Sequence, residues 1–121
     1  MRYKIFGHSG LRVSEYALGA GTFGTSCGYG SESNEARRIF DLYAEKGGNF
    51  LDTADFYQFG KSEELVGDFV ASSREDFVLA TKFSLGPSAN GSLMTTGNSR
   101  HVMVRCVEES LKRHREALGD A

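Results

Sequence analysis

The chain has 121 residues, of which 40% are hydrophobic and 25% charged, and its formal net charge is −2. This length predicts one domain or a piece of one. The nearly balanced charge gives no electrostatic case for a nucleic-acid or anionic-membrane partner. The cysteines, Cys27 and Cys106, lie far apart with no histidine at metal-ligand spacing, and no apolar run reaches the about 18 residues that a membrane helix needs. We therefore expect a cytoplasmic protein with no metal site, and a buried free thiol at Cys106.

The N-terminal segment, residues 1–16, predicts a β-hairpin, because two stretches of alternating polar and apolar residues flank Gly7–Gly10. The short apolar run Tyr16–Leu18 then predicts a first buried strand. A loop rich in glycine, serine and threonine follows, and it extends to about Ser33.

The first helix is predicted to begin at Ser33 or Asn34, since either side chain can cap the free backbone N–H groups. Its apolar residues recur at helical spacing on one face. They are Ala36, Ile39, Phe40 and Tyr43. Gly47 and Gly48 end this helix, and residues 49–52 predict the second strand.

The second helix is predicted to be capped by Ser62 and to bury one apolar face. Residues 77–81 form a continuous apolar run, which is typical of a strand buried on both faces. A polar loop over residues 84–98 is long enough to be functional or mobile. The third helix begins near Arg100, and a basic group around Arg113 is interpreted as its solvated surface.

The elements therefore alternate as a hairpin followed by three strand–helix pairs. Alternation of this kind predicts right-handed crossovers and a parallel sheet covered by helices, the α/β class.

Asp52, Tyr57 and Lys82 lie at or just beyond the carboxyl ends of two predicted strands. Taken singly, the acid could cap a turn, the tyrosine could be packing, and the lysine could be a solvated charge. An acid, a phenol and an ammonium at the same edge of a parallel sheet instead indicate a proton-transfer site. Asp55 is interpreted as a loop residue or as support for that site.

The glycines of Gly19–Gly24 allow two interpretations. They match the dinucleotide-binding pattern G-x-G-x-x-G, in which Asp52 would hold a ribose hydroxyl. That mechanism needs a helix to open at the glycines, whereas loop residues follow here. The alternative is a (β/α)8 barrel, where catalytic groups gather at the carboxyl ends of the strands and a preceding hairpin could close the other end.

Four segments carry a specific resemblance, in their order and their spacing. They are Leu18–Gly24, the run Asn49–Tyr57 containing Asp-Thr-Ala-x-x-Tyr, Gly60–Glu63, and Ala80–Lys82. Over roughly residues 1–112 the chain resembles the aldo-keto reductase family. The resemblance implies the N-terminal part of a (β/α)8 TIM barrel, with the hairpin, about three βα units and an incomplete barrel, as a partial domain over residues 1–121.

The same resemblance implies NADPH-dependent reduction of a small aldehyde or ketone. Asp52, Tyr57 and Lys82 would be catalytic, with Tyr57 as the general acid. A phenol with a pKa of about 10 gives up its proton reluctantly, and a nearby ammonium stabilises the phenolate. Lys82 fits that role, and Asp52 would keep it charged and aimed. Gly21, Thr22 and Phe23, together with Asp52, are the expected cofactor-binding residues.

The family's fourth catalytic residue is a histidine at the end of a fourth strand, and His114 comes too early to take that role. A chain with three strands leaves two open sheet edges. We therefore expect a truncated reductase of doubtful activity alone, with weak or absent NADP(H) binding. The alternatives are a non-catalytic protein that self-associates through its open edges, or a Rossmann-type dinucleotide binder.

Overall fold

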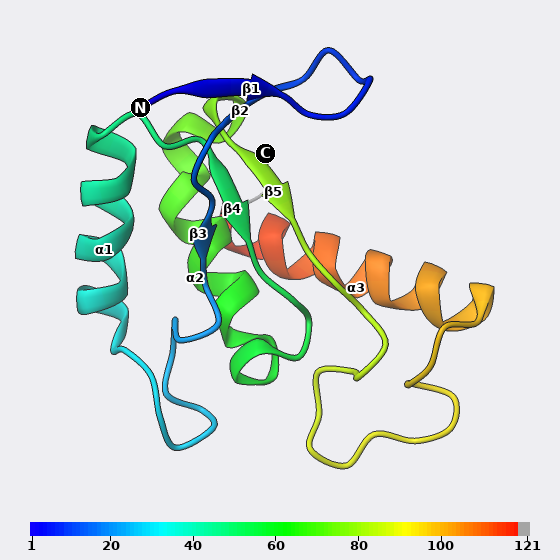
Figure 1. The fold of residues 1–121 in the computed structure, drawn as a ribbon. Coiled ribbons are helices and arrows are strands. Elements are labelled where there is room, and N and C mark those ends of the chain that lie inside the picture. The colour runs from blue at the N-terminus through cyan, green and yellow to red at the C-terminus, as the bar shows by residue number, and fades with distance from the viewer. Residues whose placement is uncertain (119–121) are drawn as a thin grey trace.

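The computed structural model describes residues 1–118 and opens with the predicted hairpin. Strand β1 (Tyr3–Ile5) pairs antiparallel with β2 (Arg12–Ser14). The backbone N–H of Ser14 donates a hydrogen bond of 2.7 Å to the side-chain oxygen of Asn49, which directly precedes strand β4 (Phe50–Asp52). The hairpin therefore lies at the amino end of the central sheet, opposite to the edge where the strands end (Figure 1).

The central sheet has three parallel strands, β3 (Leu18–Gly19), β4 (Phe50–Asp52) and β5 (Val78–Ala80), in that order. Strand β3 is shorter than predicted and excludes Tyr16. The carbonyl of Tyr16 instead accepts a hydrogen bond of 2.7 Å from the hydroxyl of Tyr43. Because the strands are parallel, all three carboxyl ends meet at one edge of the sheet (Figure 1).

Helices α1 (Ser33–Glu45) and α2 (Lys61–Val70) cover one face of this sheet. The predicted apolar face of α1 packs inward. An aromatic group fills the layer between the helices and the sheet, with the ring of Phe40 5.6 Å from that of Phe69 and 5.2 Å from that of Phe77. Two short 3-10 segments flank α2, η1 (Tyr57–Gly60) and η2 (Ala71–Asp76).

The predicted helix caps are wrong. Helix α1 begins after Glu32 and α2 begins after Gly60, and neither has a side-chain cap. Ser62 lies within the first turn of α2, where its hydroxyl donates to the carbonyl of Ala20 at 2.7 Å. Its partner is therefore the neighbouring loop and not its own helix.

Helix α3 (Arg100–Leu118) packs against α2. Val102 and Cys106 are buried as predicted, whereas Met103, Val107 and Leu111 on the same expected stripe are 40–45% exposed. Among the described elements α3 packs mainly against α2, and this part of the stripe stays half uncovered.

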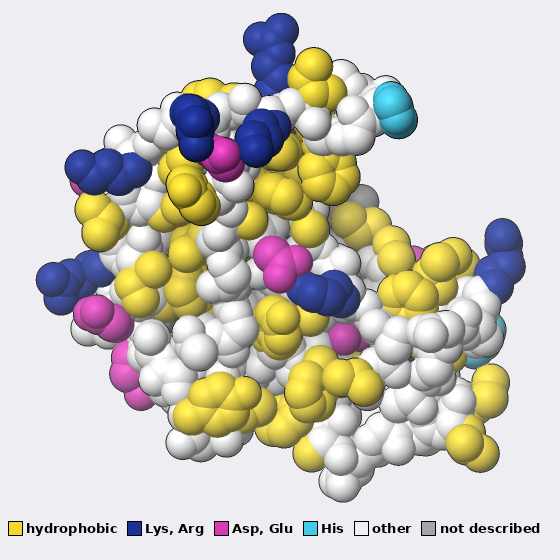
Figure 2. All heavy atoms as spheres, viewed as in Figure 1, with side chains coloured by type: hydrophobic (Ala, Val, Ile, Leu, Met, Phe, Trp, Pro, Cys, Tyr) yellow, Lys and Arg dark blue, Asp and Glu magenta, His cyan; other side chains and the backbone are white. Residues whose placement is uncertain are grey.

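The second face of the sheet has no helix over it in residues 1–118 (Figure 1). Strand β5 is consequently half-buried and not fully buried as predicted. Hydrophobic side chains gather on this side of the molecule, beneath the hairpin (Figure 2). Among the described residues, no helix is long and apolar enough to cross a membrane.

Candidate active site

Asp52 and Lys82 form an ion pair at the carboxyl edge of the sheet. Asp52 is the last residue of β4, and Lys82 follows β5 by two residues. Backbone pairing continues past the strand ends, since the N–H of Asp55 donates to the carbonyl of Lys82 at 3.0 Å. The Lys82 ammonium donates to both carboxylate oxygens of Asp52, at 2.7 and 2.8 Å, and to the carbonyl of Thr53, at 2.8 Å. All three of its N–H donors are used, so the charge is fixed in place.

Tyr57 lies directly beside this pair. It opens η1, and the Lys82 nitrogen lies 5.1 Å from the centre of its ring, within the range of a cation–π contact. Gly21 faces the same ring, because a methyl group added at this position would be 3.7 Å from it. The structure thus brings Asp52, Tyr57 and Lys82 together at one edge of the sheet.

A cavity of about 300 Å³ adjoins the Tyr57 ring. It is lined by Gly21, Thr22, Cys27, Tyr29, Phe56, Tyr57 and Gln58. Two of the predicted cofactor-binding residues, Gly21 and Thr22, are thus part of its wall. Phe23 is 1% exposed as a whole residue and its ring packs against Phe69 at 5.9 Å, so the structure places it in the core and not in the cavity wall.

The Rossmann interpretation of the glycines fails on the local structure. That interpretation requires a helix to begin at the glycine-rich segment. Residues 20–32 instead form a loop, and helix α1 begins only at Ser33. No helix N-terminus therefore lies at these glycines to receive a pyrophosphate.

Buried hydroxyl groups hold the strand ends in place, and the sequence reasoning missed them. The hydroxyls of Thr53 and Ser62 lie 2.9 Å apart, and Ser62 also bonds the carbonyl of Ala20. Both side chains are fully buried. A serine near the start of a helix is usually interpreted as its cap, so the sequence pattern predicted a hydrogen bond within α2 and not the one to Ala20.

Glu63 is the second missed residue, and it joins α2, α3 and the end of β5. Its carboxylate is fully buried, accepts from the hydroxyl of Thr81 at 2.6 Å, and is paired with the guanidinium of Arg113 at 2.5 Å. The Arg113 side chain is 14% exposed, so its predicted role as solvated surface is wrong. The side chain of His114 lies 3.9 Å from Glu63, and burial lowers its pKa although the charge of Glu63 opposes this.

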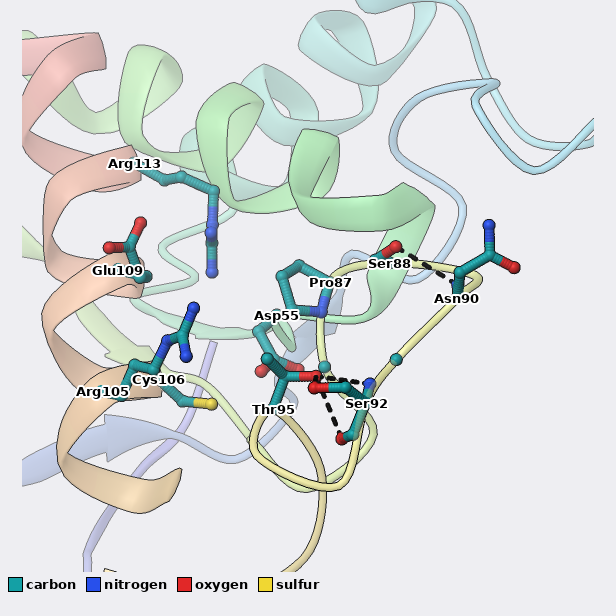
Figure 3. Close-up of a pocket in the computed structure, with 12 residues that line it drawn as sticks. Asp55, Pro87, Ser88, Asn90, Ser92, Thr95, Arg105, Cys106, Glu109 and Arg113 are labelled. Carbon is teal, nitrogen blue, oxygen red and sulfur yellow. Dashed lines mark hydrogen bonds between the residues drawn. The ribbon is translucent and has the colours of Figure 1, made fainter. Parts of the chain in front are cut away.

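Asp55 faces a different cavity, of about 360 Å³, between the loop of residues 84–98 and α3 (Figure 3). It is 1% exposed, and among the side chains that the structure describes, residues 1–114, its Oδ2 atom has no hydrogen-bond partner. Burial, and then the charge of Glu63, raise the pKa of Asp55. Cys106 lies in the same cavity, and burial raises the pKa of its thiol, as fits the predicted buried free cysteine. Asp55 is thus separate from the cavity beside Tyr57.

The sequence model of the Aldo/keto reductase family matches residues 16–118. The chain belongs to the Aldo/keto reductase family. It is 48% identical over 81 residues to norsolorinic acid reductase B of Aspergillus parasiticus, covering 63% of this chain and 21% of the relative. It is 45% identical over 82 residues to the uncharacterized oxidoreductase YqkF of Bacillus subtilis, covering 68% of this chain and 25% of that protein.

Solved structures give the same assignment. An aldo-keto reductase from Bacillus halodurans in its holo form superposes with a TM-score of 0.79 at 34% identity, over 95% of this chain and 37% of that one. The chain thus spans well under half the length of the relatives it matches. Its fold is the N-terminal part of their (β/α)8 barrel, with the hairpin, three βα units and an open sheet.

Proposed function

We propose that this chain carries the proton-donating part of an NADPH-dependent reductase of aldehydes or ketones, with Tyr57 as the general acid. One observation supports this most strongly. Lys82 is held by both oxygens of Asp52 and lies 5.1 Å from the centre of the Tyr57 ring. An ammonium in that position can stabilise the phenolate that remains when the tyrosine gives up its proton.

The residues beside Tyr57 fit a nicotinamide ring. Gly21 contributes only backbone to the cavity wall, and the aromatic rings of Tyr29, Phe56 and Tyr57 supply flat surfaces. Gly21, Thr22 and Asp52 would hold this end of the cofactor. When bound, the nicotinamide supplies the hydride for the carbonyl carbon.

The chain's own residues supply the proton. Reducing a carbonyl to an alcohol places a hydride on carbon and a proton on oxygen, and the Tyr57 hydroxyl would donate that proton. Lys82 would stabilise the resulting phenolate, which regains its proton from water, while Asp52 keeps the ammonium aimed at the ring. A well-placed general acid of this kind contributes about 10²–10⁴-fold in rate.

Cofactor affinity is expected to be weak for the 121 residues alone. In (β/α)8 barrels the phosphate-binding loops frequently follow strands seven and eight, which are not among the elements described here. NADPH dependence and a cytoplasmic location stay predictions.

A second proposal, self-association, rests on the edge strands β3 and β5 and on the half-exposed apolar stripe of α3. Light scattering tests it, and a compact monomer at high concentration would reject it.

The test of the reductase proposal is Tyr57→Phe, with Tyr29→Phe as its matched control. Tyr29 lines the same cavity but lies outside the Lys82 contact. NADPH oxidation is followed with a panel of aldehydes and ketones, and norsolorinic acid is included because of the relative named for it. We expect Tyr57→Phe to lower kcat by about 10²–10⁴-fold and Tyr29→Phe to lower it by less than about tenfold. Unchanged turnover in Tyr57→Phe would reject the phenol as the proton donor.

A further inference from the structure

We propose that Gln58 is a positioning residue, whose buried amide fastens the glycine-rich loop of residues 21–31 to the turn that carries Tyr57. The inference rests on the proposed function for its catalytic consequence. Its structural part concerns only contacts within this chain and can be tested without turnover.

The Gln58 side chain joins segments that are far apart in the sequence. It is 1% exposed. Its Oε1 atom accepts from the backbone N–H of Cys27 at 2.9 Å, and its Nε2 group donates to the carbonyl of Gly21 at 3.3 Å. One amide thus satisfies backbone groups at the start and in the middle of the loop, with both ends of the side chain occupied.

The backbone at Gln58 is strained, which makes the presence of a glutamine informative. Its φ and ψ are 52° and 35°, those of the next residue, Phe59, are 52° and 45°, and Gly60 also has positive φ. Residues other than glycine rarely adopt this left-handed region, and they do so only where the surroundings hold them there. A glycine would remove the strain at position 58 but would also remove the amide. The two hydrogen bonds of the amide are therefore what a glutamine provides at this position and a glycine cannot.

The loop runs close around this amide. A methyl group added at Gly30 would lie 3.2 Å from the Gln58 amide nitrogen and 2.1 Å from the carbonyl oxygen of Gly24. One added at Gly24 would lie 3.3 Å from the Gln58 side chain. Gly30 therefore has room for glycine alone, because the backbone of Gly24 would overlap any side chain there, whereas a side chain at Gly24 would press on Lys61 and Gln58.

The contact reaches Tyr57 through Gly21. The residue whose carbonyl accepts from the Gln58 amide is also the residue that faces the Tyr57 ring. Cys27, held by the other end of the amide, lines the same cavity. Gln58 thus fixes two points of the cavity wall and one contact on the ring of the proposed acid. Releasing it should let the wall move and misplace the hydroxyl, while leaving the acid chemically intact.

The experiment compares Gln58→Gly and Gln58→Met with Phe59→Gly. Gln58→Gly removes strain and amide together, and Gln58→Met keeps the side-chain length but loses both hydrogen bonds. Phe59→Gly removes strain of the same kind at the adjacent position and leaves the amide in place. The first readout is the rate at which iodoacetamide alkylates the half-buried Cys27, measured by peptide mass spectrometry, with buried Cys106 as the internal reference. The second is kcat and KM for NADPH-dependent carbonyl reduction.

We expect both Gln58 variants to label Cys27 about tenfold faster, as the loss of two hydrogen bonds of ordinary net strength implies, and Phe59→Gly to stay within about twofold of wild type. We expect kcat to fall about tenfold with little change in KM, because a misplaced proton donor affects the transition state more than binding. Unchanged labelling in Gln58→Met would overturn the inference, and faster labelling with wild-type kcat would overturn the positioning role. If the wild-type protein reduces no carbonyl even at NADPH concentrations high enough to offset its weak affinity, the proposed function fails, while the labelling result still decides whether Gln58 holds the loop.

Discussion

Replacing Arg113 by alanine should lower the free energy of unfolding more than replacing an exposed charged residue by alanine. Arg113 is the charged partner of Glu63, whose carboxylate is fully buried. Removing one member of a buried ion pair leaves the other charge uncompensated, at a cost of about 3–5 kcal/mol. Small domains have a free energy of unfolding of about 5–15 kcal/mol, so this is a large share of the total. The aliphatic part of Arg113 also packs on Gly60, so part of the loss would come from contacts between α3 and the turn before α2.

Urea unfolding followed by circular dichroism measures the change. The matched control is Arg38→Ala, because Arg38 pairs with Glu35 where both side chains are more than half exposed, and such pairs contribute at most about 1 kcal/mol. Adding Glu63→Gln to Arg113→Ala should recover part of the loss, since a neutral amide costs less to bury than an unpaired carboxylate. A loss below about 1 kcal/mol in Arg113→Ala would refute the reasoning that the buried charge holds α3 on α2.

Two further predictions concern buried polar groups. Burial and the charge of Glu63 raise the pKa of Asp55 above its ordinary value of 3.8, so the native state keeps a proton that the unfolded chain releases. Asp55 should therefore contribute a fall in the free energy of unfolding as the pH rises from 3.8 through its raised pKa. Asp55→Asn should abolish this fall, and the exposed control Asp76→Asn should keep it. If the fall persists in Asp55→Asn, another group causes it. The Tyr43 hydroxyl bonds groups of the hairpin, β4 and the segment before β3. Tyr43→Phe should cost about 1–3 kcal/mol in urea unfolding, whereas Tyr3→Phe, which removes one exposed hydrogen bond, should cost less than about 1 kcal/mol, and equal losses would contradict this account.

The sequence predicts the order of elements well, because that order depends on periodicity and glycine. The hairpin, the three parallel strands and the three helices all appear where alternation and apolar spacing place them. The edge at which Asp52, Tyr57 and Lys82 gather follows from the same reasoning, since the carboxyl ends of parallel strands lie together. The half-buried state of β5 could not be predicted, because burial depends on which elements cover a face and not on the residues of that face alone.

Contacts between side chains that lie far apart in the sequence could not be predicted from the sequence. Arg113 sits among basic residues on a helix and reads as solvated surface, although its partner Glu63 lies 50 positions earlier. Gln58 carries no signal at all in a single sequence, because nothing in its neighbours reveals a left-handed backbone or an amide bonded to Cys27. Ser62 is interpreted from the sequence as the cap of its own helix, whereas its hydroxyl forms a tertiary hydrogen bond to the carbonyl of Ala20.

The geometry of the proposed site should depend on few parts of the chain. Asp52, Tyr57 and Lys82 fall within a single βαβ unit, and backbone pairing between β4 and β5 aligns the first and the last of them. The buried side chain of Glu63 bonds Thr81, next to Lys82, from the helix of that same unit. None of these contacts requires a strand beyond β5. Arrangement of the proton-donating residues and affinity for the cofactor's phosphates are therefore separable properties. The first arises within residues 18–82, including the loop that Gln58 holds beside Tyr57, and the second from the loops after strands seven and eight of such barrels.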